Sequence, residues 1–449
     1  MIPLINLSYI FVFLLLIEVF ILKVNFSSPS FIFTGSFTLC SISTLFISTS
    51  WNFYYLSEET FNVIFISSML FVVVEEIVRL SASLSINSKK QKIIARKSRN
   101  RIPISPKILY FTIAMSIVGL LWTSYYIYGF IRSGDWVRIM AEYKDTVNQD
   151  VSSLGQEKVL LNQIMKISTV TNYILLLVYN INSINGVFKR GEKKLYIISF
   201  ILFLLFRFFL SGGRQGVFFF LVAWLTCYYI LNTYSSSKKK LAEVNLQYFK
   251  ILLLVITIVL PLFYFMGRAA GRKESDIIFE AAFGYLSSGI YGFEQIVSQH
   301  YSSHYWGAVS FPNLYSMLKF FDIIPQNLKD LGFLPFFNHG NTVSIIGRWY
   351  WDFGDVGVYI MTIITSFFYS ILYYYGIYLS NSMRNRNIAI ILYCILVYAL
   401  YFAGYDDFIM AIISFNYFLI IILVVIFYIL LIPKLKTKKI VIYLDYDQK

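Results

Sequence analysis

The sequence has few residues that cross-link or bind metals. Its 449 residues include only three cysteines, three histidines and nine prolines, and charged residues make up 14% of the chain. Cys40, Cys227 and Cys394 stand far apart, each inside an apolar stretch. This placement excludes a disulfide framework and the close spacing of metal ligands. Redox chemistry is therefore not expected.

The sequence also lacks internal repeats and a segment of soluble composition. Without a repeat, a transporter built from two related halves is not indicated. What the chain does contain is apolar, with 58% hydrophobic residues and a mean hydropathy of +0.66, more than one soluble core can hide. The sequence predicts an all-α polytopic membrane protein with a single transmembrane domain over residues 1–449.

Membrane spans can be placed from the apolar stretches, since each needs about twenty such residues. The first stretch follows Met1 and Ile2 without a basic leader or a small-residue cleavage site, so we expect a retained helix and not a signal peptide. The chain offers about eleven candidate spans, near residues 3–22, 29–49, 60–80, 108–131, 159–184, 195–211, 215–234, 248–266, 354–379, 387–404 and 408–432.

Basic residues indicate the orientation, because Lys and Arg collect in cytoplasmic loops. The net charge of +14 is concentrated in alternate loops, near residues 89–107, 189–194, 238–240, 384–386 and 434–439. The amino terminus is therefore expected outside and the carboxyl terminus in the cytoplasm. Nucleic acid is an alternative partner for the first cluster, but a cytoplasmic loop beside anionic membrane lipids needs fewer assumptions.

This orientation predicts two outer loops, residues 132–158 and the larger 267–353. Long ordered loops commonly carry function. Residues 278–297 are apolar enough to form an amphipathic helix along the interface. Aromatic residues of the larger loop could stack on sugar rings, although anchoring among lipid headgroups is the simpler interpretation; they are Tyr285, Tyr291, Tyr301, Tyr305, Trp306 and Tyr315.

Arginines are expected at the outer ends of several spans. Arg214 lies in a polar, glycine-rich turn, and Arg207 lies seven residues earlier inside a span, where a charge is costly. Arg268 and Arg272 are four residues apart and would share a helix face. Guanidinium groups bind phosphate oxygens bidentately, so we predict a clamp for a pyrophosphate. The alternative is that each arginine only anchors a helix end at the headgroups.

Residues 341–357 lead into the ninth predicted span. Arg348 and Asp352 are four residues apart and Asp355 follows, a spacing typical of a local ion pair that caps a helix. Asp406 and Asp407, in a short outer turn, are further partners for an arginine or a sugar hydroxyl.

Glu75 and Glu76 stand four and three residues before Arg79. This spacing predicts a structural ion pair within one helix, near the cytoplasmic side.

The segment around Asp352 resembles a known family. Its pattern Tyr-x-Asp-Phe-Gly-x-x-Gly, made by Tyr350, Asp352, Phe353, Gly354 and Gly357, follows a large outer loop and enters a late span, as in the Wzy-type O-antigen polymerases, or oligosaccharide repeat-unit polymerases. The Ser-Gly-Gly-Arg turn at residues 211–214 is similar to a hairpin of the same family.

The resemblance implies a GT-C-like helical bundle in a bacterial inner membrane. It implies a glycosyltransferase that joins repeat units carried on undecaprenyl pyrophosphate into O-antigen or capsular polysaccharide at the outer face. It also implies a reaction without metal or other cofactor, and a chain-length regulator as partner.

This reaction needs stabilised charge on the leaving pyrophosphate and a base for the acceptor hydroxyl. For the pyrophosphate we predict Arg214, Arg268 and Arg272, then Arg348, with Arg207 as a further suspect. Spacing does not single out the base among Glu294, His300, His304, His339 and Asp352. His300 and His304 would make half a metal site, but no third ligand accompanies them, so no metal is predicted.

Two other functions use similar lipids. An O-antigen ligase shares the donor and differs in the acceptor, and the sequence separates it poorly from a polymerase. A lipid-linked oligosaccharide flippase would line a central cavity with cationic residues and would not need so long an outer loop. The arginines expected at outer ends therefore favour an enzyme.

Overall fold

The computed structural model describes most of the chain as helix. Three of the predicted site residues, Arg272, His304 and His339, lie outside the described residues, as do most of the first outer loop and the basic run at 89–100. The described residues are 1–88, 101–128, 138–140, 142–143, 155–211, 213–235, 238–269, 278–301, 306–324, 340, 342–380 and 382–432.

Within this part of the chain, nine helices are long and apolar enough to cross a membrane. The chain is thus a polytopic, nearly all-helical membrane protein. The two remaining predicted stretches are also helical: α9 (Lys238–Ala269) contains residues 248–266, and the apolar α16 (Phe415–Leu431) is 17 residues long. The nine are Leu4–Ile21, Pro29–Trp51, Glu58–Ser85, Pro106–Tyr128, Val159–Asn185, Glu192–Ser211, Gln215–Tyr234, Ile345–Tyr378 and Met383–Tyr401.

The chain divides into two compact units. Unit 1 contains Met1–Leu84, Asp276–Ala389 and Leu396–Leu419, and unit 2 contains Ser85–Ser275, Ile390–Ile395 and Ile420–Lys449. Three helices are divided between the units: the last residues of α3 (Glu58–Ser88) belong to unit 2, and α13 (Met383–Leu396) and α16 each contribute to both.

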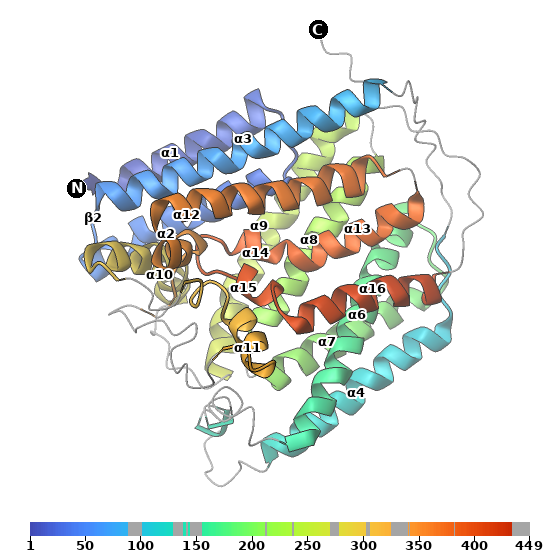
Figure 1. Ribbon diagram of the computed structural model, residues 1–449. Helices are drawn as coiled ribbons and strands as arrows, with labels where there is room; N and C mark the ends of the chain where they lie inside the picture. The colour runs from blue at the N-terminus through green and yellow to red at the C-terminus, as the bar shows by residue number, and fades with distance from the viewer. Residues whose placement is uncertain are drawn as a thin grey trace. The chain divides into compact units, whose positions relative to one another are not determined.

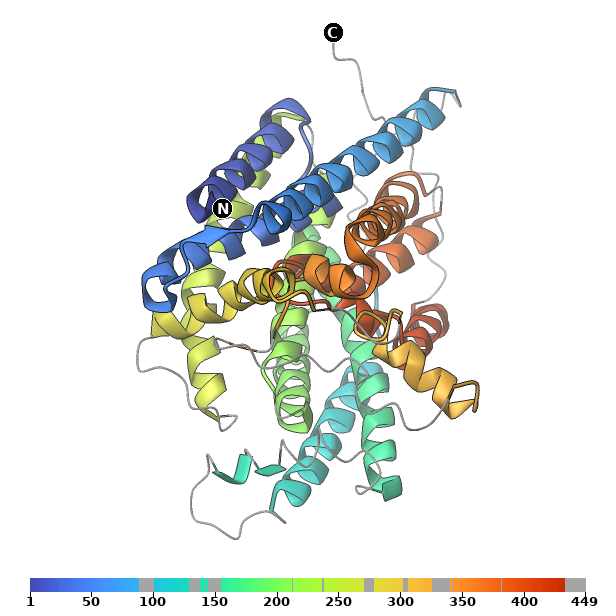
Figure 2. The same ribbon diagram turned by 60° about the vertical axis from the view of Figure 1, so that its left-hand side comes forward.

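Unit 1 is built around α2 (Pro29–Trp51), which packs against α1, α10 and α12. Figure 1 shows α1, α3 and α12 running in similar directions, and Figure 2 shows the full length of α3 from another side. The elements of this unit are β1 (Ile2–Pro3), α1 (Leu4–Leu16), the π-helical η1 (Ile17–Ile21), α2, β2 (Tyr55–Leu56), α3 (Glu58–Ser88), α10 (Ile278–Ser298), α11 (Pro312–Phe320), α12 (Ile345–Ser370), the π-helical η2 (Ile371–Tyr378), α14 (Tyr398–Tyr401) and α15 (Ile409–Ile412).

Local sequence explains both ends of α2. The Ser28 hydroxyl accepts a hydrogen bond from Phe31 N at 3.4 Å, and Pro29 occupies the first turn, where its missing N–H is not needed. Asn52 ends the helix in the left-handed conformation, φ 51°. Many small hydroxyl residues line the helix between these ends, which lets its neighbours approach closely.

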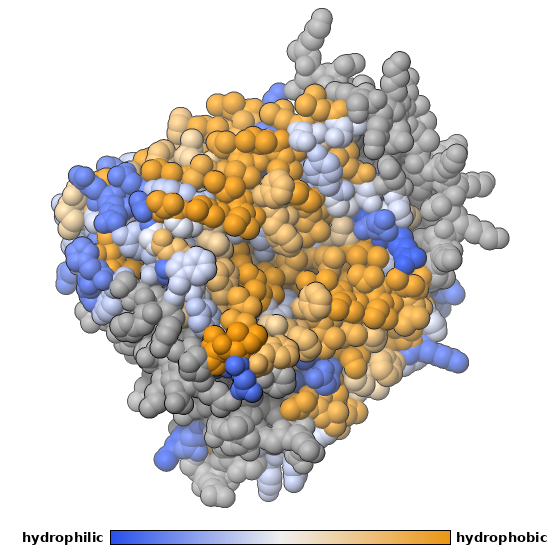
Figure 3. Space-filling model, viewed as in Figure 1, coloured by the Kyte–Doolittle hydropathy of each residue, from blue (hydrophilic) through white to orange (hydrophobic). Residues whose placement is uncertain are grey.

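Three long helices of unit 1 begin at one end. β1 pairs antiparallel with β2, which places the start of α1 beside the start of α3. The Tyr350 hydroxyl donates to Glu59, so the start of α12 lies there too. Figure 3 shows hydrophobic surface along α3 and α12 and hydrophilic atoms at the left edge, where α3 begins. This distribution fits helices whose sides face lipid and whose ends reach water.

Unit 2 contains α4 (Pro106–Tyr128), α6 (Gly155–Asn185), α7 (Glu192–Ser211), α8 (Gln215–Ser235) and α9. The helix α6 packs against α4, α7 and α8, while α8 also packs against α9. Buried polar pairs join these helices: Ser199 Oγ donates to Asn172 Oδ1 at 3.1 Å, and Ser116 and Ser168 lie 3.2 Å apart. Such hydrogen bonds are a common means of helix association in lipid.

The predicted outer loop at 267–353 is largely helical where it is described. The expected helix at 278–297 is confirmed as α10, and α11 follows it. The ninth span was predicted to begin at 354, but α12 begins at Ile345, capped by Ser344 Oγ, which accepts from Gly347 N at 3.3 Å. Gly354, with φ 66° and ψ −171°, interrupts the helical geometry inside α12. Charged and aromatic residues lower the hydropathy of this first part, which hid the helix start.

Candidate functional site

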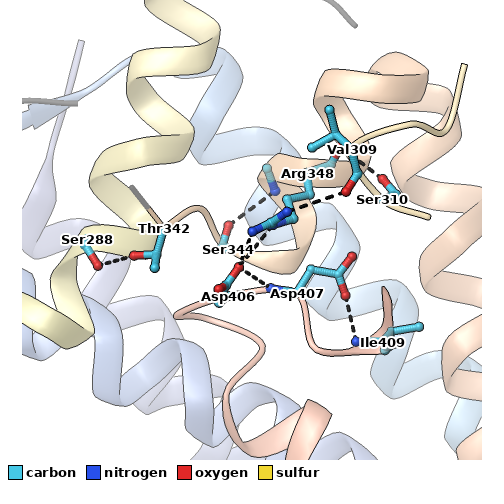
Figure 4. Close-up of polar contacts among 10 residues, drawn as sticks. Ser288, Val309, Ser310, Thr342, Ser344, Arg348, Asp406, Asp407 and Ile409 are labelled. Carbon is cyan, nitrogen blue, oxygen red and sulfur yellow. Dashed lines mark hydrogen bonds and ion pairs between the residues drawn. The ribbon is translucent and has the colours of Figure 1, made fainter. Parts of the chain in front are cut away.

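Arg348 is buried at the start of α12 and binds an aspartate from a distant turn. Its Nε and Nη2 lie 3.0 and 2.9 Å from Oδ1 of Asp406, and Nη1 lies 3.5 Å from Val309 O (Figure 4). The expectation that the 406–407 turn supplies a partner for an arginine is confirmed. Because the side chain of Arg348 is only 5% exposed, this charge depends on its partner for compensation.

Asp406 uses one of its two carboxylate oxygens for these contacts. Oδ1 also accepts from Asp407 N at 2.8 Å, whereas Oδ2 receives no hydrogen bond from any residue that the structure describes. The side chain retains 11% exposure. Next to it, Asp407 accepts from Ile409 N at 2.8 Å and so fixes the start of α15. In this turn, Oδ1 of Asp406 is therefore fixed by three contacts, whereas Oδ2 is not.

Asp352 lies one helical turn after Arg348 and holds a different segment. Its carboxylate accepts from Val309 N at 3.3 Å and from Ser310 N at 2.5 Å, while Ser310 Oγ donates to Arg348 O at 3.2 Å. The salt bridge of Arg348 is thus with Asp406, and Asp352 fastens residues 309–310 to α12. This contact occupies both oxygens of Asp352.

An aromatic segment adjoins this fastening. Trp306 is 76% exposed and lies edge-on to Phe353, with ring centroids 4.7 Å apart. Tyr315 donates its hydroxyl to Trp306 O. Partial burial and the nearby charge of Asp352 raise the pKa of Tyr315, so this hydroxyl remains a donor at neutral pH. An indole face thus stays accessible close to Asp352.

Glycines let α10 approach the backbone of the 402–405 turn. A Cβ on Gly289 would overlap the carbonyls of Gly404 and Tyr405, and one on Gly292 would overlap Thr342 O. Ser344 N donates to Gly289 O at 3.0 Å, and the rings of Tyr285 and Tyr405 stack at 4.6 Å. These contacts hold the turn that carries Asp406.

The segment before α12 is fixed in the same way. Thr342 and Ser288 share a short hydroxyl contact, also drawn in Figure 4, and Ile345 N donates to Ala403 O at 2.9 Å. Sequence reasoning missed Ser288, Gly289 and Thr342. The small residues at 287–289 and 292 in α10 were the available signal, since α10 is otherwise rich in apolar side chains.

Two of the candidate bases lie near the end of α10: Glu294 is in its last part, and His300 follows its last residue. Glu294 is buried and accepts from both N and Oγ of Ser57, each at 3.0 Å, at the start of α3. A carboxylate at a helix start accepts from an N–H group that has no partner within the helix, and its negative charge interacts favourably with the positive end of the helix dipole.

His300 ends α10. It adopts φ 51°, and the N–H groups of His300 and Tyr301 donate to Val297 O and Ile296 O, which is the Schellman pattern. Its side chain is exposed.

In unit 2, the predicted arginines lie where α7, α8 and α9 meet. Phe208, Val217, Met266 and Ala269 pack together there. Arg214 is 3% exposed, donates from Nη1 to Phe263 O at 2.7 Å and lies 3.3 Å above the Phe263 ring centroid. Arg214 therefore ties the turn before α8 to α9.

Two other arginines predicted for the site are described in this unit, and both are more exposed than Arg214. Arg268 is exposed at the end of α9, and its Nη1 lies 3.3 Å from the Tyr264 hydroxyl. Arg207 is half-buried, and its side chain lies directly against Gly216. Any Cβ at position 216 would overlap it. The Arg207 side chain thus reaches from α7 to the first residues of α8, next to the turn that contains Arg214.

Part of the smaller outer loop packs on the same turn. The Tyr143 hydroxyl donates to Leu210 O at 3.2 Å, and burial raises the pKa of Tyr143 to about 12, so the hydroxyl keeps its proton. Ile127, Ile139 and Met140 pack with Tyr143.

The described residues include no group of three or more His, Cys, Asp or Glu that could hold a metal ion. Among the described side chains, unit 1 contains a buried arginine–carboxylate pair and unit 2 contains guanidinium groups, a type of group that binds anions in many proteins. No protein-family model matches the chain, and no match is found among curated proteins or among solved structures.

Proposed function

We propose that the protein is a glycosyltransferase that polymerises oligosaccharide repeat units carried on undecaprenyl pyrophosphate, at the outer face of a bacterial inner membrane. The proposal combines the membrane fold, the resemblance around residues 350–357 and the geometry of unit 1. The observation that carries it is the Arg348–Asp406 pair, in which one carboxylate oxygen is held by the arginine and the other is left for a substrate.

Asp406 fits the general base of this reaction. An acceptor hydroxyl gives its proton to Oδ2 of Asp406 while its oxygen attacks the anomeric carbon of the donor sugar. The bond from that carbon to the lipid diphosphate breaks, and the diphosphate leaves with the electron pair. Arg348 acts here as a positioning residue, because two of its nitrogens fix Oδ1 and thus the direction of Oδ2.

The leaving diphosphate needs cationic partners. The sequence predicted such contacts for arginines that lie in unit 2, where Arg207 is half-buried and Arg268 is exposed, and diphosphate binding by them is a prediction about unit 2 alone. The buried Arg214 is engaged with Phe263, and its role in this proposal is to hold the turn.

The test is an assay with purified protein and lipid-linked repeat unit as sole substrate, followed by separation of the glycan products by length. A ladder of lengths supports a polymerase. A product that forms only when a lipid A core is added identifies a ligase, and lipid movement without a new bond identifies a flippase.

A pair of variants links this assay to Asp406. Asp406→Asn removes the base and should lower the rate by at least about a hundredfold, the typical contribution of general base catalysis. Asp355→Asn is the matched control: Asp355 is exposed on α12, and its carboxylate accepts from Val356 N beside it. Equal rates in the two variants would remove Asp406 from the mechanism.

A further inference from the structure

Two glutamates are fully buried at the other end of unit 1. Glu18 in η1 and Glu75 in α3 each have 0% exposure. Glu75 contacts Tyr374 of η2, whereas Arg348 lies in the first turn of α12. Between the interruption at Gly354 and Tyr374 the chain stays helical for about twenty residues, which at about 1.5 Å per residue is on the order of 30 Å. The glutamates are thus separate from the Arg348 site.

Both oxygens of Glu75 accept hydrogen bonds. Oε2 accepts from Ser30 N, and Oε1 accepts from the Tyr374 hydroxyl at 2.8 Å. Three elements therefore meet at this carboxylate: α2, α3 and η2. The sequence predicted an ion pair for the acids near Arg79, and this prediction is confirmed for Glu76, whose carboxylate lies 2.6 Å from Arg79 Nη2.

Glu18 is only half satisfied. Its Oε1 accepts from Thr34 Oγ1 at 3.0 Å, but Oε2 is buried without a hydrogen-bond partner among the described residues. The Ser30 hydroxyl, 1% exposed, faces both Glu18 and Glu75 and likewise forms no hydrogen bond of ordinary geometry in the described part of the chain. The Ser30 hydroxyl and Oε2 of Glu18 therefore lie close together, next to the carboxylate of Glu75.

The charged and titratable groups around the pair do not supply a compensating cation. Arg79 is bound to Glu76 and donates from Nη1 to Leu22 O at 2.6 Å. Lys23 after η1 is exposed, and α2 carries no charged residue. On η2, the hydroxyls of Tyr373 and Tyr378 lie 3.2 Å apart, and that of Tyr373 also lies 2.8 Å from Ser27 Oγ.

Two negative charges in this position would be very costly. An unpaired carboxylate loses its hydration on burial, and a second one nearby repels it. A proton removes one charge and at the same time gives Glu18 a donor that the Ser30 hydroxyl can accept. A metal ion fits less well, because the nearby Glu76 is bound to Arg79 and most of the oxygens of Glu18 and Glu75 already accept protein hydrogen bonds.

We propose that Glu18, Ser30 and Glu75 form a proton-binding site. One exchangeable proton resides on Glu18 Oε2, directed towards the Ser30 hydroxyl, which in turn faces Glu75. Glu76 and Arg79, with side chains 16% and 26% exposed, form the nearby edge through which the proton exchanges with solvent. Ionisable residues inside membrane helices commonly mark such proton sites. This site does not depend on the proposed enzymatic activity.

The test is infrared spectroscopy of the full-length protein in a detergent without carbonyl groups. Between neutral and alkaline pH, the wild-type difference spectrum should lose the carbonyl band of a protonated carboxylic acid, and this band should shift in heavy water. Glu18→Gln should abolish the band, because glutamine does not titrate. Glu58→Gln, which alters an exposed residue on α3, should keep it.

Thermal unfolding gives a second readout on the same proteins. Charging the buried pair destabilises the folded state, so the melting temperature of the wild type should fall by several degrees as the pH rises. In Glu18→Gln the melting temperature should change much less over the same pH range. If Glu18→Gln does not fold, Glu75→Gln is used instead: it removes the like charge beside Glu18, so the carbonyl band should persist and be lost at a lower pH than in the wild type. A wild-type spectrum without the protonated band, or parallel melting profiles for wild type and variant, would overturn the proposal.

Discussion

Arg348 and Asp406 form a buried ion pair between residues 58 positions apart, in which two guanidinium nitrogens contact a single carboxylate oxygen. Such a pair is weak evidence of net stability, since both charges lose their hydration. What the pair does instead is to fix the position of α12 relative to the segment 402–408, which contains Asp406. A carboxylate that carries a proton in a reaction needs that fixed direction.

The first prediction concerns the stability of this pair. Arg348→Met or Asp406→Asn alone leaves one buried charge without its partner and should lower the free energy of unfolding by about 3–5 kcal/mol. The double variant should recover a large part of this loss, because neither charge remains. Unfolding of the four proteins in one detergent completes a double-mutant cycle. Additive losses would mean that the two residues do not depend on each other.

Local patterns in the sequence predicted the helices well but not the partners of their side chains. Long apolar stretches determine helices in a membrane almost alone, since every backbone group must be satisfied within its segment. For Arg348, the spacing of four residues favoured Asp352 as its partner, whereas in the fold its partner is Asp406. The sequence indicated the turn at 406–407 only as one possible partner of an arginine. Tertiary packing decides between such partners.

The same limit explains Glu18. Helical spacing could not indicate a partner for Glu18, because the residues near it lie on other helices: Ser30 and Thr34 on α2, and Glu75 on α3. The position of Glu18 inside a span was the available signal.

The second prediction separates structure from chemistry at Glu294. Because its carboxylate accepts two hydrogen bonds from Ser57 at the start of α3, Glu294→Gln should lower the free energy of unfolding by about 0.5–2 kcal/mol, as for loss of a helix cap. Glycan polymerisation per folded molecule should stay near the wild-type rate. A large loss of rate with unchanged stability would instead return Glu294 to the list of bases.

The third prediction concerns the approach of α10 to the 402–405 turn. Gly289→Ala places a methyl group onto the carbonyls of Gly404 and Tyr405, and backbone atoms cannot move aside as a flexible side chain can. The cost should be about 1–3 kcal/mol in the free energy of unfolding, as for overpacked cores. Gly35→Ala is the control, since a Cβ there meets nothing within 4 Å and alanine favours the helix. The two variants should therefore differ in sign, and similar melting temperatures would contradict the packing.

The last prediction links Gly216 to Arg207. A methyl group on Gly216 would occupy the space of the Arg207 side chain, so Gly216→Ala should displace the guanidinium without removing it. If this guanidinium contacts the lipid diphosphate, Gly216→Ala should slow polymerisation by about as much as Arg207→Ala, on the order of tenfold for one charge-assisted contact.

The two changes should not add, because the displaced side chain no longer exists in Arg207→Ala/Gly216→Ala. Gly213→Ala is the matched control in the same turn, since its nearest contact would be 3.7 Å away, and it should leave the rate unchanged. Multiplying losses in the double variant would show that Gly216 acts through something other than Arg207. Equal rates for all four proteins would leave Arg207 as an anchor of the helix end and shift the diphosphate contact to Arg268.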